Sequence, residues 1–379
     1  MMKKICYIVT LPLTIKAFFI PQLRYLAENG YDVTVICNDD LDIRKNLGNN
    51  IHFVPVNIPR GISITGSIKA IKQLISVFKK ENFDLIQYST PNASLYSAIA
   101  SKLVGCKIRN YHCMGFRYLG FSGLSKRIFK FIEKITCILS TDIECVSNSN
   151  LELGIKEKLF NAEKATVVFH GSTGGVDMHK FNIEYRNQWR TEIRNKYSLN
   201  EDDFVYGFVG RITRDKGINE LIEAFFSLKN NSKLMLIGNM EENNNLDLIL
   251  LEKSKYSENI IYTGAVDDVE KYFAAIDVLV LPSYREGFGN VVIESEAMGT
   301  PAIVTNIPGP IDTIIRNKTA LVVSVKNSHE LSLCMKKIHT NDYSSMSENA
   351  AQFVKENFDS DVLNMKIFER KQLLLERNK

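Results

Sequence analysis

The amino-acid sequence predicts an α/β protein built from two parallel-sheet domains in tandem. Short apolar runs alternate with amphipathic stretches along the chain, and this alternation is typical of strand–helix units repeated in a parallel sheet. A chain of 379 residues is long enough for two such domains. Residues 182–202 are polar and charged. We therefore expect the boundary there, with domains at 1–185 and 186–379.

The first domain is expected to begin with a buried strand. Lys3 and Lys4 precede its apolar run as in a signal peptide, but Lys16 interrupts the run and no small-residue cleavage pattern follows. Other β-branched or apolar runs predict strands, and apolar residues at helical spacing predict helices. The expected strands are 5–9, 32–37, 51–56, 85–88, 108–113 and 142–146, and the expected helices are 17–28, 68–82 and 95–104.

The second domain continues the alternation without repeating the sequence of the first. Ligands of such folds bind outside the carboxyl ends of the parallel strands, so the loops that follow strands are the first candidates for a site. The expected strands are 204–209, 234–237, 260–262, 278–281, 302–305 and 320–323, and the expected helices are 216–229, 269–275 and 290–298.

The composition is that of an ordinary folded protein, with 45% hydrophobic and 24% charged residues. No uncharged run reaches the length that a membrane-spanning helix needs. The seven cysteines are scattered and form no CxxC pair, which favours a reducing compartment over a disulfide framework or a zinc site. The net charge of +4 hides an excess of eight positive charges in 1–185 and of four negative charges in 186–379. We expect no nucleic-acid partner, because no RNA- or DNA-binding motif accompanies the basic residues.

The most informative segment is LPSYREGFGNVVIESEAMGTPAI, residues 281–303. A predicted strand leads into a glycine-containing loop and then into a helix. Glu286 lies in the loop and Glu294 about one turn into the helix, and two carboxylates there suit the hydroxyl groups of ribose and sugar rings. The main-chain N–H groups at the helix N-terminus, a position that favours phosphate, belong to Gly287, Phe288, Gly289 and Asn290. Taken alone, the segment also fits a loop with solvated glutamates.

A second motif, GFVGRITRDKG at residues 207–217, follows another predicted strand. Arg211 and Lys216 then lie at the carboxyl edge of that strand. Two fixed cations at this edge are suited to neutralising a diphosphate. A surface charge cluster with Asp215 is the alternative interpretation.

Together the two motifs resemble those of glycosyltransferase family 4, which consists of retaining enzymes. The resemblance covers nearly the whole chain, and EGFGNVVIE at 286–294 combined with GR-x4-KG at 210–217 is far more specific than either piece. In the first half, YSTPNASLYSAIASKLVG and RNYHCMGF resemble the branch that builds bacterial capsules, O-antigens and similar surface glycans. The family implies the GT-B fold, in which two Rossmann-like domains face each other across a cleft and the last helix packs back on the N-terminal domain.

The resemblance also implies roles in donor binding. Arg211 and Lys216 match the pair that binds the donor diphosphate. Glu294 matches the residue that binds the donor ribose. The loop whose main chain touches the donor sugar corresponds to Gly287, Phe288 and Gly289.

Two catalytic residues follow from the same resemblance. Glu286 matches the glutamate at the donor sugar, near the reacting carbon, and His112 matches the active-site histidine beside that sugar. One departure concerns the loop after the first strand, where many members have a Gly-Gly pair near the diphosphate. This chain has TLPLTIKAFF there, and Lys16 is a candidate substitute for the missing contact.

The co-substrate implied is a nucleotide sugar, with UDP-linked N-acetylhexosamines as the first donors to test. We expect no metal cofactor, because Arg211, Lys216 and the helix N-terminus can stabilise a leaving diphosphate without one. Asp40 and Asp42 formally form a DxD motif, but they lie in the acceptor-side domain, where a solvated loop is the better interpretation. Walker A and HExxH patterns are absent, and no GxGxxG follows the first strand, which argues against a dehydrogenase.

The basic N-terminal half is expected to hold a lipid-diphosphate-linked saccharide acceptor. Its segment SKRIFKFIEKI, residues 125–135, places Ile128, Phe131, Ile132 and Ile135 on one helical face. The cations nearby that we expect to contact membrane or acceptor are Lys126, Arg127 and Lys130. Such a helix suits the surface of an anionic membrane, which predicts a cytoplasmic protein held peripherally on the inner membrane face. An ordinary surface helix is the alternative.

Three functional hypotheses remain open at this point. The leading one is a retaining transferase that moves a sugar from a nucleotide donor to a lipid-linked saccharide of an O-antigen or capsule. A GT-B-like sugar-nucleotide epimerase would need no acceptor. A non-catalytic sugar-nucleotide-binding protein would bind the donor without turnover.

Overall fold

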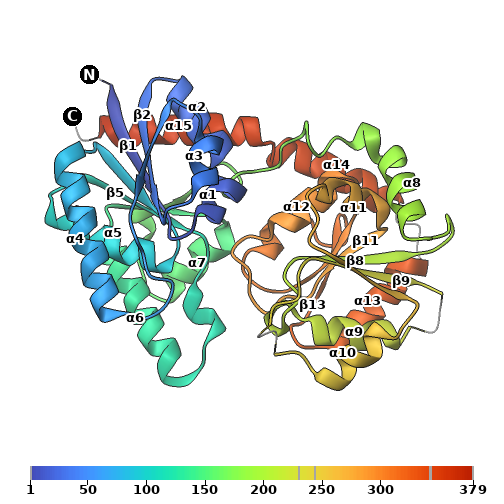
Figure 1. Ribbon diagram of the computed structural model, residues 1–379. Helices are drawn as coiled ribbons and strands as arrows, with labels where there is room; N and C mark the ends of the chain where they lie inside the picture. The colour runs from blue at the N-terminus through green and yellow to red at the C-terminus, as the bar shows by residue number, and fades with distance from the viewer. Residues whose placement is uncertain (1, 229–230, 243–244, 341–343, 378–379) are drawn as a thin grey trace. The chain divides into compact units, whose positions relative to one another are not determined.

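The computed structural model describes residues 2–228, 231–242, 245–340 and 344–377 (Figure 1). The chain divides into two compact units, each a parallel sheet covered by helices. Unit 1 comprises Met1–Gly174 with Asp361–Lys379, and unit 2 comprises Gly175–Ser360. The predicted α/β class with two parallel-sheet halves is confirmed. The division lies at Gly174 and Gly175, rather than at the expected residues 185 and 186.

The described residues of unit 1 form a seven-stranded sheet in the order β3-β2-β1-β4-β5-β6-β7. Every neighbouring pair is parallel. Its two faces carry separate apolar cores, one around Leu74, Ile86 and Tyr111 and one around Ile5, Val33 and Leu374. The strands are β1 (Lys3–Ile8), β2 (Tyr31–Cys37), β3 (Ile51–Pro55), β4 (Leu85–Tyr88), β5 (Ile108–Cys113), β6 (Asp142–Cys145) and β7 (Ala165–Val167).

The helices of unit 1 follow the predicted alternation, but those at 41–47 and 148–156 were not predicted, and one predicted helix is divided. The stretch 17–28, predicted as one helix, belongs to two helices that meet at Phe19. Pro21 explains the break, since it lacks the N–H that a continuous helix would donate to the Ala17 carbonyl group and its ring would clash with that group. The helices are α1 (Pro12–Phe18), α2 (Ile20–Glu28), α3 (Leu41–Leu47), α4 (Ile64–Glu81), α5 (Pro91–Leu103), α6 (Gly123–Leu139), α7 (Asn148–Lys156) and α15 (Ser360–Glu376), with 3-10 turns η1 (Arg117–Gly120) and η2 (Ala162–Lys164).

The C-terminal helix α15 is bound into unit 1 by a buried ion pair. Lys371 is fully buried, and its ammonium group donates to the two Glu144 carboxylate oxygens at 2.9 and 2.7 Å and to Gln87 Oε1 at 2.7 Å. Leu374 and Leu375 of the same helix lie in the apolar core. A buried ammonium group needs such partners to offset its lost hydration, so this pairing specifies where the helix docks.

The described residues of unit 2 form a six-stranded parallel sheet in the order β10-β9-β8-β11-β12-β13. The strands are β8 (Val205–Val209), β9 (Lys233–Ile237), β10 (Ile260–Gly264), β11 (Val278–Leu281), β12 (Ala302–Thr305) and β13 (Ala320–Val323). The helices are α8 (Arg186–Lys196), α9 (Ile218–Phe226), α10 (Leu248–Lys255), α11 (Val269–Ala275), α12 (Asn290–Ala297), α13 (Ser328–Thr340) and α14 (Ser344–Asn357), with 3-10 turns η3 (Ile183–Tyr185), η4 (Arg214–Lys216) and η5 (Pro310–Asp312).

The predicted helix 216–229 begins later than expected. Residues 214–216 form the 3-10 turn η4, and α9 starts at Ile218 after Gly217, which has a left-handed backbone with φ of +73°. The predicted end at Lys229 lies outside the described residues.

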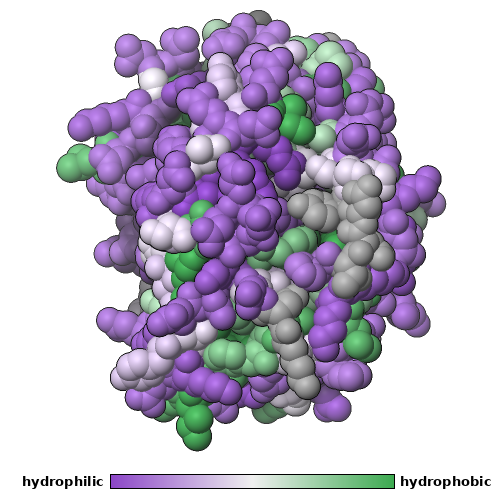
Figure 2. Space-filling view, turned by 90° about the vertical axis from the view of Figure 1, so that its right-hand side faces the viewer, coloured by the Kyte–Doolittle hydropathy of each residue, from purple (hydrophilic) through white to green (hydrophobic). Residues whose placement is uncertain are grey.

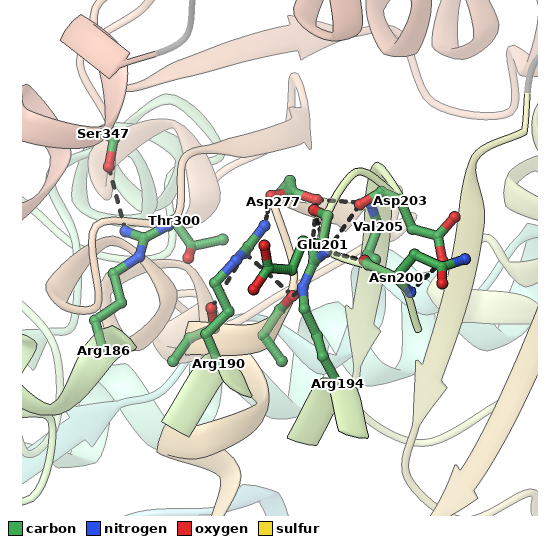
Figure 3. A network of polar contacts seen from close by, with 12 residues as sticks. Arg186, Arg190, Arg194, Asn200, Glu201, Asp203, Val205, Asp277, Thr300 and Ser347 are labelled. Atoms are coloured by element: carbon green, nitrogen blue, oxygen red, sulfur yellow. Dashed lines mark hydrogen bonds and ion pairs between the residues drawn. The ribbon is translucent and has the colours of Figure 1, made fainter. Parts of the chain in front are cut away.

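The polar segment that we expected to mark the domain boundary is an integral part of unit 2 (Figure 3). Arg190 and Arg194 of α8 bind the two carboxylate oxygens of buried Asp277 at 2.6 and 2.9 Å. Asp277 also accepts the N–H of Val205 at the start of β8, at 2.7 Å. The arginines therefore attach α8 to the sheet, which explains why so polar a segment does not behave as a linker.

Within the part of the chain that the structure describes, no helix is both long enough and apolar enough to cross a membrane. One face of the molecule, drawn in Figure 2, is mainly hydrophilic with hydrophobic side chains scattered among the polar ones. All seven cysteines are free thiols, and six of them are buried.

Candidate active site

The two motifs of unit 2 lie at the point where its strand order reverses. Residues 210–217 follow β8 and residues 282–290 follow β11, and these two strands are neighbours in the sheet. From β8 the chain continues outward to β9 and β10, whereas β12 and β13 lie on the other side of β11. Ligands of open α/β sheets bind outside the carboxyl ends of strands at such a switch point. The topology therefore brings together two motifs that are about seventy residues apart in the sequence.

Main-chain contacts join the two loops closely. The N–H of Tyr284 donates to the carbonyl oxygen of Asp215 at 2.9 Å. Gly217 packs directly against Pro282, and a Cβ atom at Gly217 would lie 2.1 Å from the Pro282 carbonyl oxygen. Only glycine fits this approach, and only glycine adopts its positive φ without strain. The spacing within each motif is thus matched by close contact between the motifs.

Lys216 and Glu286 form the centre of this arrangement. The Lys216 ammonium nitrogen lies 2.5 Å from Glu286 Oε1, and both side chains are largely shielded from solvent. Ser283 Oγ donates to the same carboxylate oxygen at 2.7 Å. The Lys216 ammonium group, which suits a phosphate, is thus hydrogen-bonded to the Glu286 carboxylate, which suits the hydroxyl groups of a sugar. Ser283 was not predicted as a site residue, although it lies in the motif-bearing segment 281–303.

Arg211 is more exposed than Lys216. Its guanidinium group donates to Glu241 Oε1 at 2.8 Å, and 54% of its side chain is accessible. Glu241 was also missed from the sequence, because it follows a different strand, β9. Arg211 can thus reach an anion at the strand edge while Glu241 limits its range of positions.

The loop before α12 is shaped by glycines and one buried aromatic ring. Gly289 is the N-cap residue of α12 in a left-handed conformation, with φ of +100° and no side-chain cap. The Phe288 ring is buried and packs edge-on against Phe358, with 5.6 Å between ring centroids. Gly309 also packs against this loop, and a Cβ atom there would lie 2.8 Å from the Gly287 carbonyl oxygen. Asn290 begins the helix. The glycines and the buried ring hold this loop in one conformation.

Glu294 lies on α12 in a partly buried position. Burial raises the pKa of Glu294 to about 7, Lys180 acts against this rise, and Glu270 adds to it. A carboxyl group with a pKa near 7 can act in two ways. When protonated it donates a hydrogen bond to a hydroxyl group, and when ionised it accepts hydrogen bonds from two hydroxyl groups. The environment of Glu294 therefore differs from that of Glu286, which is paired with a cation.

His112 lies in unit 1, near the carboxyl end of β5, and is buried. Its Nε2 atom lies 3.3 Å from Thr173 Oγ1, and its ring packs edge-on against Phe19. Burial lowers the pKa of His112 to about 4, and the nearby Glu144 acts against this shift while Lys371 adds to it. The imidazole is therefore neutral near pH 7, a form that can both donate and accept a hydrogen bond. Thr173 was missed, although it follows His170 in the HGSTGG segment.

Comparison with known proteins gives the family. Residues 190–356 match the family model of glycosyl transferases group 1, and residues 4–147 match that of glycosyl transferase 4-like domains. A capsular polysaccharide biosynthesis glycosyltransferase of Staphylococcus aureus is 30% identical over 349 residues, which cover 90% of each chain. The chain belongs to the group 1 glycosyltransferases.

Two further comparisons agree with this assignment. A UDP-Gal:α-D-GlcNAc-diphosphoundecaprenol α-1,3-galactosyltransferase of Escherichia coli is 26% identical over 318 residues, covering 81% of this chain and 80% of the other. The solved structure of Anabaena HepE in complex with UDP has a TM-score of 0.77 at 17% identity and covers 98% of this chain and 100% of that one. The predicted GT-B fold and glycosyltransferase family are thereby confirmed.

The basic helix of this glycosyltransferase, α6, lies exposed on unit 1. Lys126 and Arg127 are exposed, whereas Lys130 forms an ion pair with Glu157 of the segment after α7. The predicted apolar face is divided. Ile128 and Phe131 are exposed, and Ile132 and Ile135 are partly buried against the unit.

The DxD-like pair of the glycosyltransferase has a local structural role. Asp40 is the N-cap residue of α3, where it accepts the N–H of Ile43 at 2.8 Å, and it binds Lys16 at 3.2 Å. Lys16, the candidate substitute for the glycine loop, is thus engaged within unit 1. Among the residues that the structure describes, no group of three or more His, Cys, Asp or Glu side chains is placed to hold a metal ion.

Proposed function

We propose that this glycosyltransferase moves one sugar, with retention of anomeric configuration, from a nucleotide sugar to a lipid-diphosphate-linked saccharide in the assembly of a bacterial capsule or O-antigen. UDP-linked N-acetylhexosamines are the first donors to test. The observation that carries the proposal is the Lys216–Glu286 pair at the switch point of unit 2, beside the N-terminus of α12. The relatives from Staphylococcus aureus and Escherichia coli support the capsule and lipid-diphosphate parts, because their names state these roles.

The chemistry requires stabilisation of a departing diphosphate. As the bond between the anomeric carbon and the phosphate oxygen breaks, negative charge grows on the diphosphate and positive charge grows on the sugar ring. Arg211, Lys216 and the main chain at 287–290 would stabilise the diphosphate. Glu286 would bind the sugar near its reacting carbon, and Glu294 would bind the ribose hydroxyls. In the retaining mechanism, the departing phosphate accepts the proton of the attacking acceptor hydroxyl on the same face of the sugar.

The positive charge in this arrangement comes from side chains and main-chain N–H groups. We therefore propose that the reaction needs no metal cofactor. We further propose that the enzyme acts at the inner face of the cytoplasmic membrane, where nucleotide sugars and lipid-linked saccharides meet. The exposed cations Lys126 and Arg127 support this location, as do the free buried thiols, which suit a reducing compartment.

The test is a panel of UDP-, GDP- and dTDP-sugars, scored by release of nucleoside diphosphate with a lipid-diphosphate saccharide present. We expect one donor class to be turned over, and the product anomer to be that of the donor. Glu286→Gln should lower kcat by about 100-fold or more, the size expected when a preorganised electrostatic contact is lost. Glu223→Gln, an exposed site on α9, is the matched control and should retain wild-type activity. Full activity of Glu286→Gln would remove this residue from the catalytic site.

The same panel without acceptor separates the alternatives. An epimerase would interconvert sugar nucleotides without any acceptor, and a non-catalytic protein would bind a donor without turnover on any acceptor. Either result would overturn the proposed transfer.

A further inference from the structure

Unit 1 has a switch point of its own, between β1 and β4. These two strands are neighbours, and the strand order runs outward from them in opposite directions. Thr10 follows β1 and Thr90 follows β4, and Thr90 Oγ1 accepts the N–H of Thr10 at 3.1 Å. Thr90 has a φ of +67°, which is strained for a β-branched residue. Backbone strain of this kind clusters at functional sites.

A pocket of about 270 Å³ opens at this switch point. Besides Thr10 and Thr90, its lining includes Arg60 and Arg117, and no carboxylate is among the described residues that line it. Asn92 Nδ2 donates to the carbonyl oxygens of Pro59 and Gly61, at 2.6 and 3.0 Å, and so holds the loop that carries Arg60. The pocket thus combines two cations with hydroxyl groups, a set suited to phosphate oxygens.

Arg117 also belongs to a second, apolar groove. Its guanidinium group lies 4.6 Å from the centroid of the Phe129 ring, a geometry in which cation–π attraction fixes its position. The groove has a volume of about 320 Å³ and shares Pro91, Asn92 and Arg117 with the arginine-lined pocket. Its walls come from α4, α5 and α6. They are formed mainly by aliphatic side chains, including Ile64, Ile68, Leu95, Ile99 and Ile132.

Several of these aliphatic side chains are exposed. Ile62 is 85% accessible, Ile64 is 76% accessible and Ile68 is 51% accessible, all on the first turns of α4 or just before it. Clustered exposed apolar residues of this kind mark a binding surface. The continuity of an apolar groove with a cationic pocket matches an amphiphile that has an anionic head and an apolar chain.

We propose that these two connected sites bind the lipid-diphosphate acceptor. The diphosphate lies in the pocket between Arg60 and Arg117, and the first part of its apolar chain lies in the groove between α4, α5 and α6. The inference rests on the proposed function for the acceptor class, and it assigns that acceptor a place in unit 1 that is distinct from the basic residues of α6.

The test measures equilibrium binding of saccharide-diphosphates that carry alkyl chains of increasing length, below their critical micelle concentrations, to the full chain. Arg60→Gln should weaken binding about tenfold or more, as expected when one charge-assisted hydrogen bond is lost. Arg117→Lys, which keeps the charge, should lose part of the affinity and Arg117→Gln more of it. Arg24→Gln, an exposed arginine on α2 outside both sites, is the matched control.

The groove is tested by the dependence of affinity on chain length. For wild type, each methylene group added within the groove should raise affinity by up to about fourfold. Ile68→Asp should flatten this dependence while it leaves the affinity for the shortest probe near wild type. Since Ile68 is half exposed, this variant should fold, as its circular dichroism melting curve would show.

Two outcomes would overturn the inference, namely no binding of any probe to wild type, or wild-type affinity in both Arg60→Gln and Arg117→Gln. If, in the second case, these variants also lost binding to lipid vesicles, the site would be a docking surface for bilayer phospholipid. Binding that depends on Arg60 and Arg117 without sugar transfer would leave the inference intact and reject the proposed function.

Discussion

At the residue scale, two glutamates eight positions apart have different environments and suit different tasks. Glu286 is held by Lys216 and Ser283, so its carboxylate is fixed beside a cation. Glu294 lies about one turn into α12, where burial raises its pKa to about 7. The sequence predicted both positions, but only the fold explains why one side chain is held beside a cation and the other titrates near neutrality.

Donor affinity should therefore depend on the protonation of Glu294. If the ionised carboxylate accepts two ribose hydroxyls, affinity for an intact UDP-sugar rises as the pH rises through about 7. Between pH 6 and pH 8 the gain should be about tenfold, since the ionised fraction changes by that factor. Calorimetric titration at several pH values measures it. Glu294→Gln should show a weaker affinity without this pH dependence, and a flat wild-type profile would contradict the assignment.

His112 should reduce the stability of the fold at acidic pH. Its pKa is about 4 in the folded protein and about 6.5 in an unfolded chain. A group whose pKa is lowered by folding stabilises the folded state at pH values above its pKa in the unfolded chain. That stabilisation is lost as the pH falls towards its pKa in the folded protein. Between pH 7 and pH 4.5 the wild type should lose about 2 kcal/mol more than His112→Gln. Urea unfolding at the two pH values gives the difference, and equal losses would show that His112 is not held neutral.

At the scale of elements, the donor site depends on how two loops pack. Gly217 has φ of +73° and touches Pro282, whereas Gly264 has nearly the same φ of +72° with open space around it. A comparison of substitutions at Gly217 and Gly264 therefore separates the effect of backbone strain from the effect of losing the contact between the two loops. Arg211, Lys216 and Glu286 all lie within a few residues of this contact, so its loss should disturb donor binding.

Gly264→Ala should cost about 1–2 kcal/mol of stability, the penalty for a left-handed residue with a side chain, and should leave donor affinity unchanged. Gly217→Ala should cost more, because its Cβ would displace the Pro282 carbonyl group, and should weaken donor binding by tenfold or more. Thermal unfolding and calorimetry measure the two effects. Equal donor affinities in the two variants would show that the contact does not position the site.

The bounds of many elements follow from local patterns. The strands β4, β5, β11, β12 and β13 and the helix α11 have the predicted bounds. By contrast, the split between α1 and α2 needed the effect of Pro21, and the short strand β7 was not predicted. The polar helix α8 was taken for a boundary, because its role depends on Asp277, which lies about eighty residues later in the sequence.

At the scale of the whole molecule, membrane association remains a proposal that the surface of unit 1 supports. Leu124, Ile128 and Phe131 are exposed on α6 together with Lys126 and Arg127. The double variant Lys126→Gln/Arg127→Gln should weaken binding to anionic vesicles by roughly 30-fold at low salt, at about 1 kcal/mol for each basic residue. Lys130→Gln should have a smaller effect, since Lys130 is paired with Glu157. Vesicle co-sedimentation measures each variant.

The control for this prediction is Lys79→Gln/Lys80→Gln, which removes two exposed cations from the end of α4. It should bind vesicles nearly as wild type does, and donor affinity should be unchanged in both double variants. If the control loses as much vesicle binding, then net charge rather than α6 governs association.

The sequence by itself determined the alternation of strands and helices, the two-unit α/β architecture and the motifs of the donor site. These features follow from local patterns, because burial within a strand or helix and the chemistry of a loop are recorded in neighbouring residues. The tertiary structure decided which distant residues meet. The pairing of Lys216 with Glu286, the docking of Lys371 on Glu144 and the convergence of Arg60 and Arg117 on one pocket all depend on strand order and helix packing. Such contacts join residues far apart in the chain, and no local pattern encodes them.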